Sequence, residues 1–241
     1  MIYLRSFLFH LYFWVWSVFT AIWMLALLPL PRRFAVAALT FWSKGLFFGL
    51  RWLANIRIEV RGRENLPTGP ALVAAKHQSM FDVFSQFGLL PDACFVMKKE
   101  LLNVPLFGWH GLKAGMIVVD RAGHSTALKK LVRDTLDRMK EVRQVVIFPE
   151  GTRGAVGAPG DYKPGIAALY REMDLPVTPL ALNCGSHWGK GFLCKPGTIV
   201  FHYLPPIPAG LKRGEFMREL QTASPSRGPA RRPRAGVRQG R

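Results

Sequence analysis

The sequence has few acidic residues. Its 241 residues include 15 Asp and Glu against 33 Lys and Arg, which gives a formal net charge of +18. Such an excess of positive charge favours an anionic partner, namely nucleic acid, anionic membrane headgroups or a phosphorylated substrate. Because the chain has no helix-turn-helix, zinc-finger or aromatic RNA-binding pattern, we expect an anionic membrane surface and a phosphorylated ligand, and no nucleic acid.

Cysteine is also scarce. Cys94, Cys184 and Cys194 are an odd number and lack the spacing of a metal site. Cys94 and Cys184 stand in strand-like runs, so we expect both in the core. The sequence therefore predicts no disulfide framework, no metal and a reducing compartment.

No small-x-small cleavage site follows the N-terminal apolar run, which argues against a removable signal peptide. Residues 7–30 are long and apolar enough to span a bilayer or to lie within one leaflet. A second run, residues 34–54, is interrupted by Ser43, Lys44 and Gly45, and its tryptophans and basic residues suit an interfacial or re-entrant helix. We expect a shallow helical hairpin, with a single spanning helix as the alternative.

The basic residues near these two runs predict an orientation. Only Arg5 precedes the first run, whereas four basic residues follow it: Arg32, Arg33, Lys44 and Arg51. Because such residues favour the cytoplasmic side, we expect the protein at the inner (cytoplasmic) membrane with the domain after residue 54 facing the cytoplasm.

Strand-like and helical segments alternate after residue 54. Strands are predicted at residues 56–61, 71–75, 93–97, 115–119, 145–148, 177–183 and 198–203, and helices at residues 83–90, 105–113, 124–140 and 164–173. Buried runs between helices are typical of parallel sheets. The sequence predicts an α/β fold with a mostly parallel central sheet of about seven strands flanked by helices. Expected domains are the hairpin (1–54), the α/β domain (55–222) and a disordered basic tail (223–241).

A polar stretch with His77 and Asp82 follows the predicted strand 71–75. Within one regular helix, residues five apart differ by roughly 140° and about 7.5 Å along the axis, so these side chains could not meet. If Ser79 caps the helix instead, Asp82 lies in its first turn and can reach back to the imidazole. The carboxylate would then leave one ring nitrogen as a base. A histidine that only satisfies the loop backbone is the alternative.

A second polar stretch, residues 149–154, follows the predicted strand 145–148 and brings one carboxylate, one hydroxyl and one guanidinium. Alone it would be a tight turn with a surface arginine. Together with two further blocks, however, the two stretches resemble the four motifs of the glycerolipid acyltransferase family, and most of all its bacterial 1-acyl-sn-glycerol-3-phosphate acyltransferases. The blocks are His77-Gln78-Ser79-Met80-Phe81-Asp82, Gly115-Met116-Ile117-Val118-Val119-Asp120-Arg121, Phe148-Pro149-Glu150-Gly151-Thr152-Arg153 and Leu175-Pro176-Val177-Thr178-Pro179-Leu180.

This resemblance implies direct transfer of an acyl chain from a thioester to the sn-2 hydroxyl of lysophosphatidate, giving phosphatidic acid. His77, oriented by Asp82, would be the base. Arg121 and Arg153 would bind the phosphate with help from Lys98, and the glycerol and oxyanion end would be lined by Glu150, Gly151 and Thr152. No Gly-x-Ser-x-Gly elbow occurs and no cysteine stands beside a histidine motif, which disfavours a covalent acyl-enzyme.

We expect no cofactor, since the donor, acyl-CoA or acyl-carrier protein, is itself a substrate. Acyl-carrier protein is accordingly a candidate partner. The motifs define the transfer better than the headgroup, so another lysophospholipid or a lyso-aminolipid remains an alternative acceptor. A non-catalytic membrane-bound lipid- or nucleic-acid-binding protein is the other class, and the His77/Asp82 pair argues against it because a binder does not need it.

Overall fold

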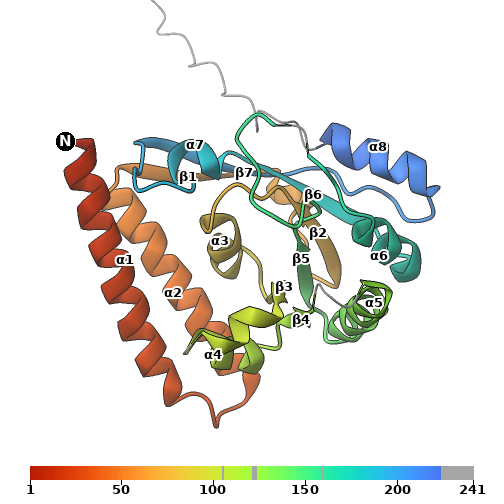
Figure 1. Cartoon of the computed structure of the whole chain (residues 1–241), viewed down its shortest axis with the longest axis horizontal. Coiled ribbons are helices and arrows are strands. Elements are labelled where there is room, and N and C mark those ends of the chain that lie inside the picture. Colours follow the sequence, from red (N-terminus) through yellow and green to blue (C-terminus); the bar gives the residue numbers. More distant parts are fainter. Residues whose placement is uncertain (105, 121–123, 159, 224–241) are drawn as a thin grey trace, which may run out of the picture.

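The computed structural model describes residues 1–104, 106–120, 124–158 and 160–223 (Figure 1). Seven strands form one sheet in the order β1-β7-β6-β2-β5-β3-β4. Their bounds are β1 Ile56–Arg61, β2 Ala71–Ala75, β3 Ala93–Lys98, β4 Ile117–Val119, β5 Gln144–Ile147, β6 Val177–Leu182 and β7 Gly197–Tyr203. The predicted fold class is confirmed, and every predicted strand has its counterpart.

Strands β6, β2, β5, β3 and β4 are all parallel, whereas β7 is antiparallel to β6 and pairs in parallel with β1. In register, Ala74 of β2 lies between Ile147 of β5 and Pro179 of β6. The carboxyl ends of β2, β5, β3 and β4 therefore share one edge of the sheet. Ligands bind at this edge in open α/β sheets.

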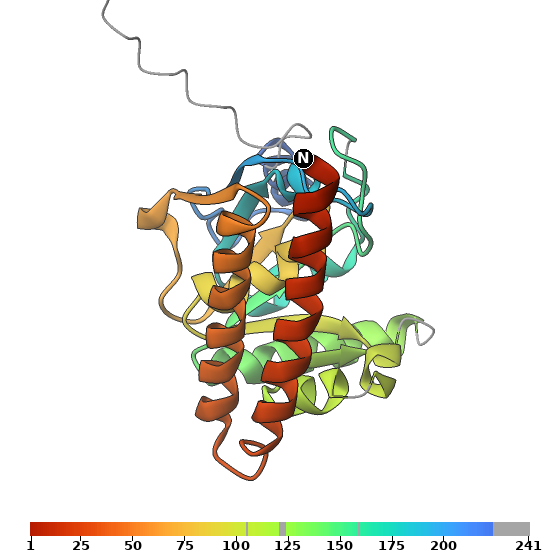
Figure 2. The same ribbon diagram turned by 90° about the vertical axis from the view of Figure 1, so that its left-hand side faces the viewer.

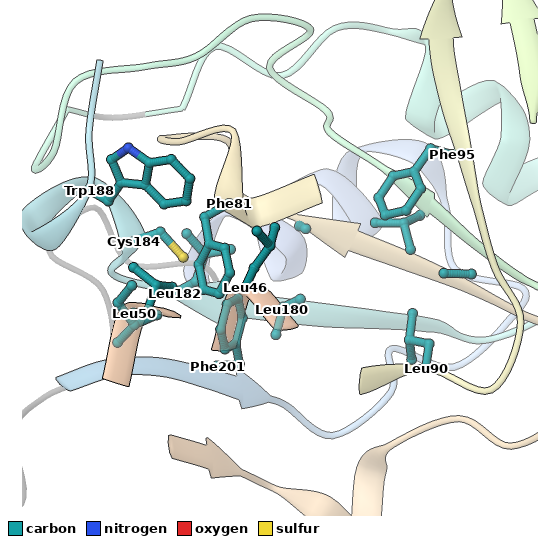
Figure 3. Packing of buried hydrophobic residues seen from close by; sticks show 14 of the residues in the cluster. Leu46, Leu50, Phe81, Leu90, Phe95, Leu180, Leu182, Cys184, Trp188 and Phe201 are labelled. Atoms are coloured by element: carbon teal, nitrogen blue, oxygen red, sulfur yellow. The ribbon is translucent and has the colours of Figure 1, made fainter. Parts of the chain in front are cut away.

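Helices cover both faces of the sheet. Successive strand residues point to opposite faces, so they join two different core clusters. Val73 and Ala75 join the core cluster under α1, α2 and α3, while Leu72 and Ala74 join the cluster under α5, α6 and α8. Figure 3 shows part of the first cluster. The α-helices are α1 Ile2–Leu25, α2 Arg32–Trp52, α3 Phe81–Leu89, α4 Phe107–Lys113, α5 His124–Lys140, α6 Gly165–Met173, α7 Cys184–His187 and α8 Arg213–Ala223, and two 3₁₀ turns are η1 Arg63–Asn65 and η2 Lys99–Asn103.

Helices α1 and α2 lie side by side as a hairpin along one side of the domain (Figure 2). The residues that interrupt the second apolar run do not break α2. A Cβ at Gly45 would lie 2.3 Å from the Trp16 ring, so the missing side chain makes room for this aromatic residue of α1. Ser43 is buried and donates to the carbonyl of Phe84 at 2.7 Å. Ser43 and Gly45 therefore serve packing, whereas Lys44 is exposed.

The hairpin also shares the core of the α/β domain. Phe9 of α1 and Leu46 and Leu50 of α2 are fully buried in the same cluster as the sheet residues. The Phe9 ring meets the Trp188 ring edge-on at 4.9 Å. The hairpin and the sheet therefore form one continuous hydrophobic core.

Polar contacts hold α1 and α2 at both ends. Near the start of α1, Ser6 Oγ accepts a hydrogen bond from the backbone of Cys194 at 2.9 Å, and His10 Nε2 lies 2.8 Å from the Phe192 carbonyl. At the start of α2, Arg32 forms an ion pair with Asp92 at 2.7 Å. The buried Arg143 donates to the same carboxylate and to the carbonyls of Ala114 and Gly115.

Two expectations are corrected, and two others fall on residues that the structure does not describe. Cys184 lies not in a strand but in the first turn of α7, although it is fully buried as predicted. Helices α7 and α8 have no counterpart in the predicted elements. The tail from residue 224 onward and Arg121 lie outside the described residues.

Candidate active site

His77 and Asp82 meet at the carboxyl end of β2. The strand ends at Ala75 and α3 begins at Phe81, so His77 lies in the connecting loop and Asp82 in the first helical turn, as predicted. His77 Nδ1 lies 3.2 Å from Asp82 Oδ2. The Asp82 side chain is fully buried, whereas the His77 side chain keeps 18% of its surface exposed. The pair therefore joins a buried anion to an accessible ring.

The loop backbone holds the Asp82 carboxylate. Oδ2 also accepts hydrogen bonds from the backbone N–H groups of Gln78 and Ser79. The predicted cap is wrong by one residue, because Met80 and not Ser79 is the N-cap, and Ser79 Oγ accepts from the backbone of Phe81 at 3.1 Å. Only the reciprocal half of a capping box forms, from Asp82 back to Ser79. It is the half that orients the carboxylate.

The partners of His77 determine its chemistry. Since an ionised carboxylate only accepts, Nδ1 carries the proton in the neutral ring and Nε2 keeps its lone pair. The Phe148 ring stacks on the imidazole, with centroids 4.3 Å apart. By contrast, His10, His110 and His187 bond to main-chain carbonyls. His77 alone among these has the geometry of an oriented base.

The loop after β5 wraps around His77. Gly154 N–H donates to the His77 carbonyl at 2.8 Å. Glu150 is buried, which raises the pKa of its carboxyl, while Lys76 and His77 beside it oppose that rise. Gly151 has φ +67°, in the left-handed region that favours glycine. The second motif is therefore fixed directly against the first.

Lys76 is a residue of the site that the sequence analysis did not single out. It is 4% exposed, and its ammonium donates to the Ala158 carbonyl at 3.1 Å. Burial lowers the pKa of Lys76, and the charge of Glu150 opposes that shift. Burial likewise raises the pKa of Glu150, which Lys76 opposes. The two charges stabilise one another beside the His77/Asp82 pair.

The predicted phosphate-binding residues follow the order of the strands. Arg153 is in the loop after β5, next to β2, and is partly exposed without an ion-pair partner among the residues described. Lys98 is exposed at the end of β3, one strand further, and Thr152 is also exposed. The structure thus brings His77, Asp82 and Glu150 together and leaves Arg153 and Lys98 along the same edge.

The described residues contain no group of three or more His, Cys, Asp or Glu side chains that could hold a metal ion. The chemistry assembled at the edge is an oriented imidazole, a buried carboxylate that can stabilise its protonated form, and two cations open to an anionic ligand. This set suits general-base activation of a hydroxyl group.

Comparison with known proteins agrees with this geometry. The sequence model named Acyltransferase matches residues 57–183, which include the candidate site. A Pseudomonas aeruginosa 1-acyl-sn-glycerol-3-phosphate acyltransferase is 37% identical over 201 residues, covering 81% of this chain and 77% of that protein. A Limnanthes alba protein of the same name is 33% identical over 160 residues, or 65% of this chain and 56% of its own length.

The fold has a solved counterpart. The crystal structure of PlsC from Thermotoga maritima, titled a 1-acyl-sn-glycerophosphate (LPA) acyltransferase, superposes with a TM-score of 0.74 at 23% identity, covering 92% of this chain and 93% of the other. The structural likeness supports the fold, and the sequence matches identify the family. This chain therefore belongs to the acyltransferase family.

Proposed function

We propose that the protein transfers an acyl chain from an acyl thioester to the sn-2 hydroxyl of 1-acyl-sn-glycerol-3-phosphate, giving phosphatidic acid for phospholipid biosynthesis. The observation that carries this proposal is the His77–Asp82 contact of 3.2 Å within the matched region. The names of the Pseudomonas aeruginosa and Limnanthes alba relatives support the acceptor.

The transfer proceeds without an acyl-enzyme. His77 Nε2 takes the proton of the sn-2 hydroxyl as its oxygen bonds to the thioester carbonyl carbon. The tetrahedral intermediate then expels the thiolate by breaking the C–S bond, and the imidazolium returns the proton to the sulfur. Asp82 stabilises the imidazolium between these two steps.

The acceptor phosphate binds along the sheet edge. Arg153 offers a guanidinium with no ion-pair partner among the described residues, and Lys98 adds a second cation two strands from β2. A guanidinium fork suits the oxygens of a phosphate monoester. Arg121 is proposed for the same role but lies outside the described residues. Glu150, Gly151 and Thr152 line the glycerol end.

The lysolipid acceptor and the thioester donor each have an alternative. Another lysophospholipid or a lyso-aminolipid would use the same base, and either acyl-CoA or acyl-carrier protein would supply the thioester. An assay of purified membranes with lysophosphatidate, other lysolipids and both donors separates them. We expect phosphatidic acid from the wild type and none from His77→Ala, with unchanged folding and membrane attachment. Near-normal turnover by His77→Ala would refute the mechanism.

We also propose that the hairpin lies on the cytoplasmic leaflet as a monotopic anchor. Helix α1 is, among the described residues, the one helix long and apolar enough to span a bilayer, a criterion that core helices and signal sequences also meet. Its contacts with the domain extend from Ser6 to Ala21. At 1.5 Å per residue they cover about 22 Å. A spanning α1 would have to abandon them.

The outer face of the hairpin suits a lipid surface. Trp14, Val15, Val18 and Phe19 are exposed and line an open apolar hollow of about 450 Å³. A second hollow, of about 340 Å³, is lined by Phe47, Ile58 and two exposed arginines, Arg51 and Arg57. Apolar side chains flanked by cations match the boundary between acyl chains and anionic headgroups.

A cysteine label tests this placement. The label is introduced at Tyr3, which is 68% exposed, since Ser6 is buried and bonded to Cys194. The background carries no native cysteine. An impermeant reagent should react in inside-out vesicles from a bacterial host and leave right-side-out vesicles unlabelled. Labelling of right-side-out vesicles would establish a spanning helix.

A further inference from the structure

One face of the His77 imidazole lies against the ring of Phe148. The two ring centroids are 4.3 Å apart and the two planes differ by 26°, which is a stacked arrangement. Phe148 follows β5 directly, and the proline after it favours an extended backbone at this position. The Phe148 carbonyl accepts a hydrogen bond from the backbone of Gly151 at 2.9 Å, which closes the turn after the strand. The local backbone thus fixes the point from which the Phe148 ring reaches His77.

Two further aromatic rings support Phe148. Phe95 of β3 is paired in register with Val146, two residues before Phe148, so both phenylalanines belong to the same face of the sheet. The rings of Phe95 and Phe148 are stacked, with centroids 6.2 Å apart and 12° between their planes. Phe95 is buried in the first core cluster (Figure 3), and the Phe87 ring of α3 meets it edge-on at 5.0 Å. The core therefore holds the Phe148 ring as well as its backbone.

The hydrogen bond to Asp82 does not fix the imidazole completely. It joins Nδ1 to Oδ2 at 3.2 Å, and so selects one of the two ring orientations that differ by a half turn about the Cβ–Cγ bond. The torsion about this bond is broad for histidine. A tilt of the ring about it would displace Nε2, the nitrogen that must reach the hydroxyl. A stacked phenyl ring resists such a tilt, because the tilt causes a clash on one edge and loses contact on the other.

We propose that Phe148 is a positioning residue for the catalytic base: by stacking on the imidazole of His77, it limits rotation about the Cβ–Cγ bond and keeps Nε2 directed at the acceptor hydroxyl. This inference rests on the proposed function. The Asp82 hydrogen bond selects which nitrogen faces the carboxylate, and the stack fixes the plane of the ring. Phe148 itself takes no part in the proton transfer.

A role in packing alone makes different predictions. Phe148 is half-buried and packs against the first core cluster, so its removal costs some stability in either case. A residue that only packs would leave the motion of the His77 ring unchanged, and its loss would not act on kcat selectively. The distinguishing measurements are therefore kcat against KM, recovery by a second aromatic residue, and the mobility of the imidazole.

The test compares Phe148→Leu with Phe148→Tyr in the full-length enzyme. The leucine variant keeps an apolar side chain without a ring, and its kcat should fall by about three- to tenfold, as expected for loss of one aromatic pair. The acceptor KM should stay within about twofold, because the cations proposed for the phosphate are unchanged. Tyrosine restores the stacked face and should recover most of kcat. A wild-type kcat in Phe148→Leu, or a Phe148→Tyr as slow as Phe148→Leu, would overturn the proposal.

Phe84→Leu is the matched control. Phe84 is also half-buried and packs against the same core cluster. Among the ring contacts of the described residues, however, it meets Phe13 and Trp42 and not His77. The same substitution there should lower the temperature of thermal unfolding and leave kcat within about twofold. An equal loss of kcat in Phe84→Leu would attribute the effect to a loosened core and overturn the proposal.

A measurement without turnover separates this inference from the proposed function. Carbon-13 relaxation of labelled histidine in detergent micelles gives an order parameter for the imidazole C–H bonds, and the His77 signals are those that disappear in His77→Ala. The order parameter should decrease in Phe148→Leu and keep its wild-type value in Phe148→Tyr and Phe84→Leu. This result would support positioning even if no lysolipid were acylated. An unchanged order parameter in Phe148→Leu would overturn it, whereas an inactive wild type would refute only the proposed reaction.

Discussion

Replacing Asp82 with Asn removes one charge and leaves the shape of the catalytic loop nearly intact. The backbone N–H groups of Gln78 and Ser79 both point at Oδ2. An asparagine amide can satisfy these two donors only with its oxygen in that place, since an NH₂ group there would leave both unpaired. We therefore expect the loop and the tautomer of His77 to persist in Asp82→Asn.

The loss then falls on the imidazolium formed during transfer. Two unit charges about 4 Å apart attract by about 4 kcal/mol at an effective dielectric constant of about 20, and here the two atoms are 3.2 Å apart. Loss of that attraction in the transition state corresponds to roughly 1000-fold in kcat. The KM for the acceptor should change little, because Asp82 is fully buried and does not contact substrate.

Steady-state transfer to lysophosphatidate in detergent measures this loss, with thermal unfolding as the check on folding. The double variant His77→Ala/Asp82→Asn should be no slower than His77→Ala alone, because Asp82 acts only through the ring. A decrease of less than tenfold in Asp82→Asn, or a double variant in which the two losses multiply, would refute the assignment of Asp82.

Three further outcomes are expected. Arg153→Ala should lower kcat/KM for lysophosphatidate by about 2–3 kcal/mol equivalent, and should lower it less for lysolipids without a phosphate monoester. The control Arg171→Ala, which changes an exposed arginine of α6, should leave kcat/KM unchanged for both kinds of acceptor. Equal losses for all acceptors in Arg153→Ala would contradict the phosphate role. The fold raises the pKa of Glu150, so ionisation of this carboxyl destabilises the protein. Below about pH 4 the free energy of unfolding should depend on pH in the same way in the wild type and in Glu150→Gln. As the pH rises from there to 7, the free energy of unfolding of the wild type should fall relative to that of Glu150→Gln. Parallel pH profiles would contradict that shift. Gly49→Ala should destabilise the protein by about 1–3 kcal/mol in chemical unfolding, since its Cβ would lie 2.4 Å from the Tyr12 ring, whereas Gly214→Ala in α8, where the nearest atom is 3.8 Å away, should be neutral or slightly stabilising.

The strands were predictable because local patterns reflect their burial. The apolar run of β2, and that of β5 after Gln144, indicate strands covered on both faces, and both strands are fully buried. Helix α8 had a usable signal that the sequence interpretation missed: Phe216 and Leu220 are four residues apart and both buried. The four residues of α7 are too few for any periodicity. The antiparallel direction of β7 depends on long-range pairing that no local pattern encodes.

In the candidate site, too, contacts local in the sequence were predictable and contacts between distant residues were not. His77 and Asp82 were predictable because their contact spans five residues and a helix start. The contact of Lys76 with Glu150 depends on a residue far along the chain. From the sequence alone, a lysine after a strand is predicted to lie on the surface. Only the folded arrangement identifies Lys76 as a buried residue of the site.

If the hairpin binds a bilayer as proposed above, the core that it shares with the sheet couples that binding to the stability of the whole enzyme. The inner sides of α1 and α2 supply Phe9, Leu46 and Leu50 to the cluster that also includes Phe81, next to Asp82. Whatever binds the outer face of the native hairpin, and not the unfolded chain, adds its binding free energy to the stability of the catalytic domain. Under the monotopic placement proposed above, the same adsorption that brings the enzyme to its lysolipid also stabilises the native state. Enzyme released from the membrane would then be the first to unfold and be degraded, so the cell would retain active protein where its substrate is.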